Sequence, residues 1–327
     1  TDDLTIAGPG ASQLTISGAN ARRIYLVDNA DAATTITVHI SGLTLANGKI
    51  AGDHGGAISN RESLTLQDCT LTNNQAAGHG GAVYNLGALN LFNSTIAGNI
   101  ADYNDSNAEN GGGIYSSGTL TVVGSTVSGN RGYNNAGGIF INSNSTAVLR
   151  DSIILGNSAD GHAGGIQNLG TLSVVNSTIT NNVADVNGSG SGDGGGIYNS
   201  GTLTIENSTI SGNLAYEYGG GIVNGATLRV LSSTISGNFA SYYGGGIHNA
   251  STGNVKVHNS TIFGNSCGYS GGGILNWGGT LTVASSTIAK NTADSNSNGT
   301  GAGGGIRTPS GSTTLHNTIV EIGRAHV

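Results

Sequence analysis

A four-residue phrase recurs along this chain of 327 residues and constrains its fold more than any other feature. The phrase reads Gly or Ala, Gly, Gly or Ala, then Ile or Val, and it occurs ten times at spacings of 25 to 32 residues. Its aliphatic members are Ile58, Val83, Ile114, Ile139, Ile166, Ile197, Ile222, Ile247, Ile274 and Ile306. A period of this length indicates a repeat architecture with one supersecondary unit per repeat.

A second phrase, similar to S-T-I-x-G-N, lies within each unit. Its last residue is Asn in all nine complete units: Asn74, Asn99, Asn130, Asn157, Asn182, Asn213, Asn238, Asn265 and Asn291. Between the two phrases apolar residues alternate with polar ones, as Leu203, Ile205 and Ile210 show. A period of two predicts short strands with one buried face, and we expect three such strands in each unit.

A single unit carries too few aliphatic side chains to offset the entropy lost on ordering it, so neighbouring units must stack. Stacking identical residues over one another predicts a parallel β-helix with one coil per repeat, about 12 coils of about 25 residues. The Asn columns then form ladders of amides between coils. A second ladder is predicted from Asn60, Asn85, Asn168, Asn199, Asn224, Asn249 and Asn276. Cys69 falls in a column of small inward residues and is predicted to be a buried, inert thiol.

The phrases GGAI at 55–58 and GGAV at 80–83, each followed by an I-x-x-N such as Ile210–Asn213, resemble those of bacterial surface β-helix repeat proteins. Polymorphic outer-membrane proteins, with GGAI and FxxN repeats, and choice-of-anchor repeat proteins are the nearest families, although this chain has Ile, Leu or Val in place of Phe. The resemblance implies an all-β, single-stranded right-handed parallel β-helix of the pectin lyase-like kind. It also implies an exported adhesin or autotransporter passenger at the bacterial cell surface or in the extracellular space.

The repeat divides the chain into three parts. Residues 1–50 read as irregular N-terminal coils and residues 51–320 as the regular repeats. In the tail 321–327, EIGRAHV, Ile stands at position 322, where the repeat predicts Asn. Because the pattern fails there, we expect these residues to be a non-native tail translated from a sequencing adapter. No Met or signal peptide opens the chain at Thr1, so we expect the native N-terminus to lie upstream.

Length varies mainly between the ladder Asn and the next Gly phrase, where the connection has five or eleven residues. Such loops line one edge of a solenoid, which is commonly its binding edge. Seven of the eleven tyrosines fall there, and we take five as candidate ligand-binding residues: Tyr216, Tyr218, Tyr242, Tyr243 and Tyr269. Tyr218, Tyr243 and Tyr269 are predicted to stand in file, about 4.8 Å apart. Their rings suit stacking on sugars or gripping a protein, or they simply cover the glycine-rich backbone.

Composition limits the partners. Charged residues make up 9% of the chain and the net charge is −7. The chain therefore lacks the excess of Lys and Arg that binding to the phosphates of nucleic acid needs. No apolar run reaches membrane-spanning length, so a membrane is contacted only through a missing anchor. Two cysteines exclude a disulfide framework, and no cofactor is expected. A surface glycan or a protein is the partner that we expect.

Two groups of residues raise the question of a metal site. His54, His79 and His162 each precede a Gly phrase, but no carboxylate column accompanies them in the sequence. The loop 102–109 holds three acidic residues, which suit weak calcium binding or a merely solvated surface. We therefore predict no metal site.

Many β-helices cleave polysaccharides, a reaction that needs two or three convergent carboxylates or a metal with a basic residue. The outward column that follows the Gly phrases runs from Ser59 to Arg307 and contains no acid. We therefore expect no catalytic residues and no enzyme activity, with a polysaccharide lyase or hydrolase as the alternative. A further alternative is ice binding by the outward Thr column: Thr70, Thr95, Thr126, Thr178, Thr209, Thr234, Thr261, Thr287 and Thr318.

Overall fold

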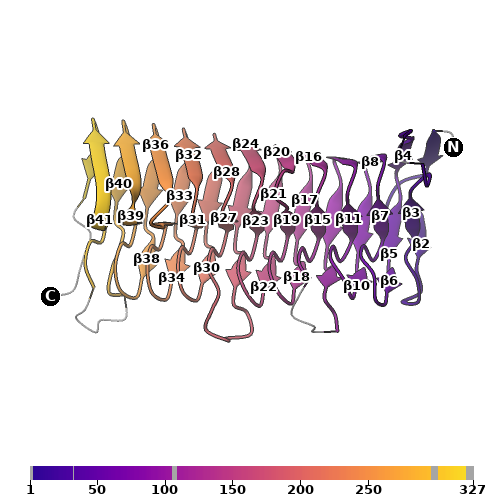
Figure 1. Cartoon of the computed structure of the whole chain (residues 1–327), viewed down its shortest axis with the longest axis horizontal. Helices are drawn as coiled ribbons and strands as arrows, with labels where there is room; N and C mark the ends of the chain where they lie inside the picture. The colour runs from indigo at the N-terminus through magenta and orange to yellow at the C-terminus, as the bar shows by residue number, and fades with distance from the viewer. Residues whose placement is uncertain (1–2, 32, 105–108, 296–300, 322–327) are drawn as a thin grey trace.

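The protein is a rod of stacked coils with its two ends at opposite ends of the long axis (Figure 1). The computed structural model describes residues 3–31, 33–104, 109–295 and 301–321, and within them the secondary structure is entirely β. Every pairing between named strands is parallel and joins one coil to the next or, at the N-terminal end, to a nearby coil. The predicted fold, an all-β right-handed parallel β-helix, is confirmed.

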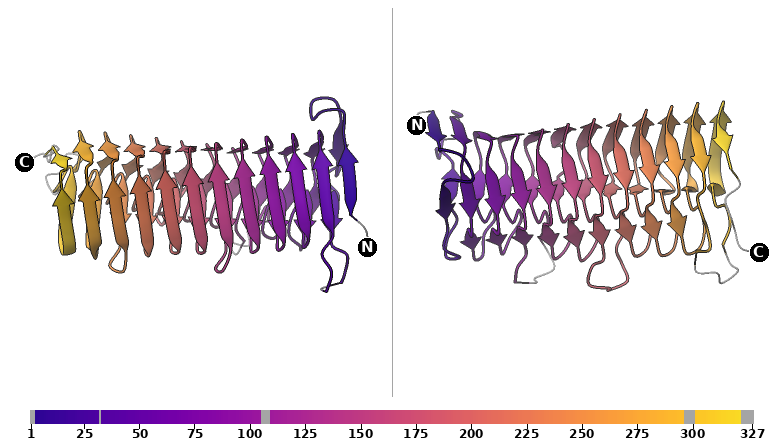
Figure 2. Two further views of the ribbon diagram at one scale, coloured as in Figure 1. Left: turned by 90° about the horizontal axis from the view of Figure 1, so that it is seen from above. Right: turned by 180° about the vertical axis from the view of Figure 1, so that it is seen from behind.

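Three sheets run the length of the rod (Figure 2). The largest has 21 strands, and one of its two rows consists of β1 (Leu4–Ala7), β4 (Thr37–Ser41), β8 (Ser63–Gln67), β12 (Ala88–Phe92), β16 (Thr119–Val123), β20 (Thr146–Arg150), β24 (Thr171–Val175), β28 (Thr202–Glu206), β32 (Thr227–Leu231) and β36 (Asn254–His258). The other row consists of β3 (Tyr25–Val27), β7 (Ile58–Asn60), β11 (Val83–Asn85), β15 (Ile114–Ser116), β19 (Ile139–Ile141), β23 (Ile166–Asn168), β27 (Ile197–Asn199), β31 (Ile222–Asn224) and β35 (Ile247–Asn249). The long strands β39 (Ile274–Ala284) and β41 (Ile306–His316) belong to both rows.

The second sheet has 12 strands, one from each coil, in agreement with the predicted number of coils. Its strands are β2 (Thr15–Ser17), β5 (Thr44–Ala46), β9 (Thr70–Thr72), β13 (Thr95–Ala97), β17 (Thr126–Ser128), β21 (Ile153–Leu155), β25 (Thr178–Thr180), β29 (Thr209–Ser211), β33 (Thr234–Ser236), β37 (Thr261–Phe263), β40 (Thr287–Ala289) and β42 (Ile319–Val320).

The third sheet has nine two-residue strands. They are β6 (Lys49–Ile50), β10 (Gln75–Ala76), β14 (Ile100–Ala101), β18 (Arg131–Gly132), β22 (Ser158–Ala159), β26 (Val183–Ala184), β30 (Leu214–Ala215), β34 (Phe239–Ala240) and β38 (Ser266–Cys267). A regular coil therefore holds four short strands, and not the three that the sequence pattern predicts, because a turn after the second-ladder residue divides the first sheet into two rows.

The core follows from the register. Leu203 pairs with Leu228 and Ile205 with Val230, so aliphatic side chains stack in continuous columns inside the rod. Ile197, Ile205 and Ile210 have no exposed surface. Parallel strands buried in this way gain both apolar burial and hydrogen bonds from their neighbours, which explains why a single unit cannot fold alone.

The first Asn ladder is confirmed. Each side-chain Nδ2 donates to the Oδ1 of the Asn one coil further on, at 2.8–3.0 Å, from Asn74 to Asn291. The backbone N–H of each donor Asn reaches the same oxygen. These side chains are at most 1% exposed, so the ladder satisfies polar groups that would otherwise be buried without partners.

The second ladder is confirmed in two segments. Asn60 donates to Asn85, and the amides from Asn168 to Asn276 continue in the same way. Between the segments Asn85 donates to the Ser116 hydroxyl at 3.0 Å, and Ile141 follows Ser116 in register. The ladder breaks there because Ile141 has no side-chain donor or acceptor.

Glycine is required where coils approach most closely. A Cβ at Gly220 would lie 2.3 Å from the backbone oxygen of Phe239 on the next coil, and Gly219 beside it has a φ of +61°.

The prediction for Cys69 also holds, because this thiol is 2% exposed and burial raises its pKa. Residues 1–50 contain β1 to β6, and the predicted non-native tail lies, after Glu321, outside the described residues. The described residues include no helix with the length and apolarity that a membrane crossing needs.

Candidate functional site

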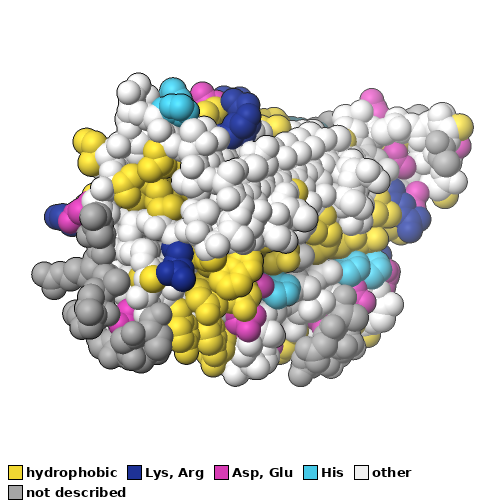
Figure 3. Space-filling view, turned by 60° about the vertical axis from the view of Figure 1, so that its left-hand side comes forward, with side chains coloured by type: hydrophobic (Ala, Val, Ile, Leu, Met, Phe, Trp, Pro, Cys, Tyr) yellow, Lys and Arg dark blue, Asp and Glu magenta, His cyan; other side chains and the backbone are white. Residues whose placement is uncertain are grey.

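The variable loops leave the third sheet along one edge of the rod (Figure 1), as their common position in the repeat predicts. Three successive loops, after β30, β34 and β38, carry the five candidate tyrosines. With two residues of neighbouring strands they form a cluster that we call the aromatic patch: Tyr216, Tyr218, Tyr242, Tyr243, Tyr269, His248 and Trp277. Hydrophobic side chains gather in a patch low on the near half of the rod, with histidines beside it (Figure 3).

The tyrosines form two rows, and the predicted single file is wrong. Tyr218 pairs with Tyr243 in register, with ring centroids 5.7 Å apart, but Tyr243 pairs with Ser270. Tyr269 stands one position earlier in its loop and stacks on Tyr242 at 5.4 Å, with the rings only 6° from parallel. The difference arises because the five-residue loop 266–270 ends in Tyr-Ser, whereas loop 239–243 ends in Tyr-Tyr.

Stacking determines what the patch offers to a ligand. Rings that lie face to face along the rod cover each other's faces and leave edges and hydroxyl groups toward solvent. Trp277 differs, since its ring is tilted 48° from that of Tyr243 and the residue is 47% exposed. The patch therefore combines one accessible indole with a row of phenol edges.

A hollow of about 330 Å³ lies in the patch, lined by Tyr218, Tyr243, His248, Ala250, Ser251 and Trp277. This volume is at the lower end of the range of small-molecule sites. Burial lowers the pKa of His248 to about 4, so its imidazole is neutral at pH 7. Burial and the nearby Glu217 carboxylate raise the pKa of Tyr218, which keeps its phenol protonated. The hollow thus presents neutral aromatic and hydroxyl groups.

Sequence reasoning missed Trp277 and His248 as site residues. His248 lies in the outward column that follows the Gly phrases, where a lone histidine gives no sign of a site, and Trp277 lies in β39 where the register with β41 shifts. Trp277 is the one tryptophan of the chain and lies two residues after a position of the outward column. That position was the signal that could have marked it as a site residue. Other loop tyrosines have structural partners: Lys49 lies over the ring of Tyr103 and Arg131 over that of Tyr133, both at 4.2 Å.

The residues before the Gly phrases form a further column of side chains that accept backbone hydrogen bonds. Nδ1 of His54 accepts the N–H of His79 at 2.9 Å, and Nδ1 of His79 accepts that of Asn110 at 3.0 Å. Three coils on, His162 accepts the N–H of Asp193 at 3.2 Å. These histidines therefore have a structural role that their position alone did not reveal.

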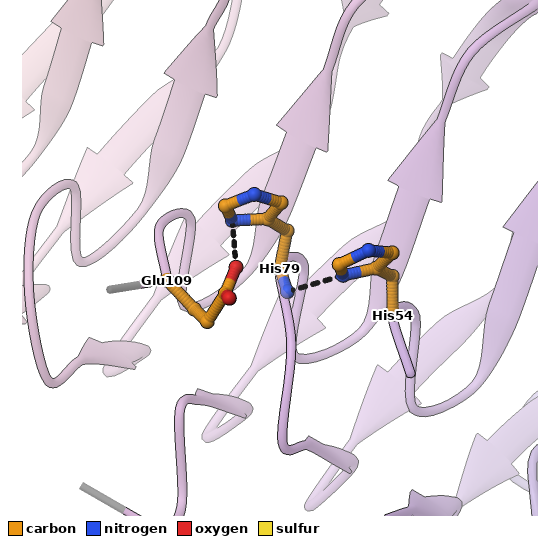
Figure 4. Close-up of side chains that lie close together, drawn as sticks. All are labelled: His54, His79 and Glu109. Carbon is orange, nitrogen blue, oxygen red and sulfur yellow. Dashed lines mark hydrogen bonds and ion pairs between the residues drawn. The ribbon is translucent and has the colours of Figure 1, made fainter. Parts of the chain in front are cut away.

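A carboxylate does join this column, contrary to the expectation from the sequence. Oε2 of Glu109 lies 2.8 Å from Nδ1 of His79 (Figure 4). Each of the side chains His54, His79 and Glu109 offers one possible ligand atom, and these three atoms lie within 4.8 Å of one another. The pattern hid Glu109 because it is near the end of an eleven-residue connection. Of the predicted acidic loop 102–109, residues 105–108 lie outside the described residues, and Asp102 is buried.

Comparison with family models decides the family. The model of the right handed beta helix region matches residues 123–288, about half of the chain. The chain belongs to the right-handed beta helix family. A second model, of the Chlamydia polymorphic membrane protein repeat, matches residues 68–86, a segment that contains Asn74 and the phrase at 80–83. Searches of curated proteins and of solved structures found no match. The two family matches point to a surface-exposed bacterial repeat protein.

This right-handed beta helix also has a charged pocket near its N-terminal end, which the sequence pattern did not predict. It measures about 410 Å³ and is lined by Arg23, Leu26, Asp28, Asp53, His54, Ser59, Arg61 and Tyr84. Each of its carboxylates has an arginine partner, Asp28 with Arg61 and Asp53 with Arg23. Burial acts to raise the pKa of Asp53, but the hydrogen bonds from Arg23 and from the backbone of His54 outweigh it and lower the pKa. Both acids thus form an ion pair with an arginine of the pocket.

The predicted threonine column lies on the outer side of the second sheet of this beta helix, where its members from Thr70 to Thr287 are half-buried. The prediction for Thr318 is wrong, because Ile319 and not Thr318 pairs with Thr287. It is continuous from Thr178 to Thr287 and is interrupted by Ile153 and Ile319. The hydroxyl array is therefore regular over part of the rod only.

Proposed function

We propose that the chain is a non-catalytic rod of the adhesin or passenger type, displayed on a bacterial surface or secreted, whose aromatic patch binds a glycan or protein ligand. The observation that carries this proposal is the hollow of about 330 Å³ bounded by Trp277, Tyr218, Tyr243 and His248. It combines an accessible indole face with hydroxyl groups, which is the mixture of apolar surface and oriented polar groups that ligand sites use.

Rigidity favours binding at this edge. The five-residue connections that carry the tyrosines each begin with a two-residue strand of the third sheet, and in that sheet β30 and β34 have a paired strand on both sides. Aromatic side chains held in this way lose little conformational entropy when a ligand arrives. The ion pairs of Asp28 with Arg61 and of Asp53 with Arg23 support a non-catalytic role for the charged pocket, because both carboxylates already have a charged partner.

Binding to glycan arrays and to immobilised surface proteins tests the proposal. The double variant W277A/Y243A removes the indole and the central ring of the patch, and we expect its binding signal to fall by at least about 30-fold, as for an interface hot spot. Y133A is the matched control, because Tyr133 occupies an equivalent loop but lies over Arg131 outside the patch. Equal binding of wild type and double variant would reject the patch as the site. Release of products from a polysaccharide panel would contradict the non-catalytic assignment.

A further inference from the structure

Successive coils bring three metal-ligating side chains together on the loop edge, at a distance along the chain from the aromatic patch. His54 and His79 precede neighbouring Gly phrases, and Glu109 is the last residue but one of the connection that leads to the next phrase. In Figure 4 the carboxylate of Glu109 points to the ring of His79, and Nδ1 of His54 points to the backbone nitrogen of His79. One ligand atom of each of the three side chains lies within 4.8 Å of the others. We propose that His54, His79 and Glu109 form a binding site for a divalent transition-metal ion, with Zn²⁺ as the best-suited ion.

The hydrogen bonds show which ring nitrogens are unprotonated. Nδ1 of His54 and Nδ1 of His79 each accept a backbone N–H from the next coil, so neither carries a proton, and a metal ion bound there would displace that N–H. A neutral imidazole with an unprotonated nitrogen is the form that binds metal ions.

The contact between His79 and Glu109 points to a cation. Oε2 of Glu109 is buried, has no hydrogen-bond donor among the described residues, and lies 2.8 Å from Nδ1 of His79. Nδ1 of His79 is itself an acceptor, since it takes the N–H of Asn110. Two acceptor atoms in contact repel unless a positive charge lies between or beside them. That charge is either a shared proton or a metal ion, and the third ligand, His54, favours the metal.

The donor set selects the kind of ion. Two imidazoles and one carboxylate, with a water in the remaining position, are a ligand set of zinc sites, whereas Ca²⁺ and Mg²⁺ prefer oxygen ligands. The side chains of His79 and Glu109 are 21% and 24% exposed, which leaves a path for the ion and room for the water. Binding costs the backbone hydrogen bonds that the two Nδ1 atoms accept now, so we expect micromolar rather than tighter affinity. A bound ion would tie three successive coils together.

Calorimetric titration of the full chain with Zn²⁺ alone, in a buffer that does not chelate metals, tests the site. We expect one ion per chain in the tight phase. E109Q keeps the size of the side chain and breaks no backbone hydrogen bond, so it should fold normally and weaken the tight phase by roughly 100-fold or more. H54Q should weaken it similarly.

The control is H162Q. His162 has the same place in its coil and also accepts a backbone N–H. Its carboxylate neighbour is Asp193, at 3.5 Å, and among the described residues it belongs to no group of three possible metal ligands. H162Q should therefore bind Zn²⁺ as the wild type does. The proposal is overturned if the wild type shows no saturable binding, which would assign the His79–Glu109 contact to a shared proton. Unchanged affinity in E109Q, or loss of the tight phase in H162Q, would overturn it as well.

Discussion

Substitution of one ladder residue, Asn182→Ala, is expected to destabilise the rod strongly. Asn182 donates through Nδ2 to Asn213 Oδ1 and to the Ile154 backbone oxygen, and its Oδ1 accepts both the backbone N–H and the side-chain Nδ2 of Asn157. The variant leaves that backbone N–H buried without its acceptor, a loss of about 1–3 kcal/mol. Three further side-chain hydrogen bonds contribute about 0.5–1.5 kcal/mol each. The free energy of unfolding should therefore fall by about 2.5–7.5 kcal/mol.

Urea unfolding followed by circular dichroism measures this change, and hydrogen exchange localises it. We expect protection to fall first in the coils that contain Asn157 and Asn213, because each coil depends on its neighbours. Asn254→Ala is the control, since Asn254 is exposed at the start of β36 and should change stability by no more than about 0.5 kcal/mol. If Asn182→Ala were as stable as this control, the ladder would contribute nothing net and our account of the fold would fail.

Two further predictions concern buried titratable groups. His248 has a folded-state pKa of about 4 against the usual 6.5, so protonation favours the unfolded chain, and stability present above pH 6.5 is lost as pH falls toward 4. Protonation of His248 accounts for a loss of up to about 3 kcal/mol in the free energy of unfolding. The urea midpoint of His248→Phe should therefore decrease less than that of the wild type between pH 6.5 and 4. The same decrease in both proteins would refute the assignment to His248. Cys267 has no exposed surface and burial raises its pKa to about 11, so a thiol reagent at pH 8 should label it only after unfolding. Rapid labelling of Cys267 in the folded rod would contradict this burial.

The regular part of the molecule was predictable because it repeats. Ile205 and Asn213 each have equivalents in almost every unit, and in a stack of coils the same sequence position must occupy the same place in space. The fold, the core columns and the first ladder therefore followed from spacing alone. The break in the second ladder was also visible, since Ser116 and Ile141 stand where Asn is expected.

The candidate sites were less predictable because they depend on departures from the repeat. Glu109 reaches His79 only because an eleven-residue connection ends beside it, and counting from the Gly phrase gives no sign of this contact. Trp277 meets Tyr243 where the pairing of β39 with β41 shifts register. The spacing places Tyr269 in the row of Tyr243, but the residue lies one position earlier and stacks on Tyr242.

The ladder has a consequence for how the length of the rod can change. Its amide contact is the same at all eight steps from Asn74 to Asn291, so any coil can follow any other without a new kind of contact. Excision of residues 214–238 would join Asn213 directly to Phe239 and bring Asn265 into the place of Asn238. Unequal exchange between similar repeats would therefore shorten or lengthen such rods by whole coils, while the loop edge kept its position relative to the core.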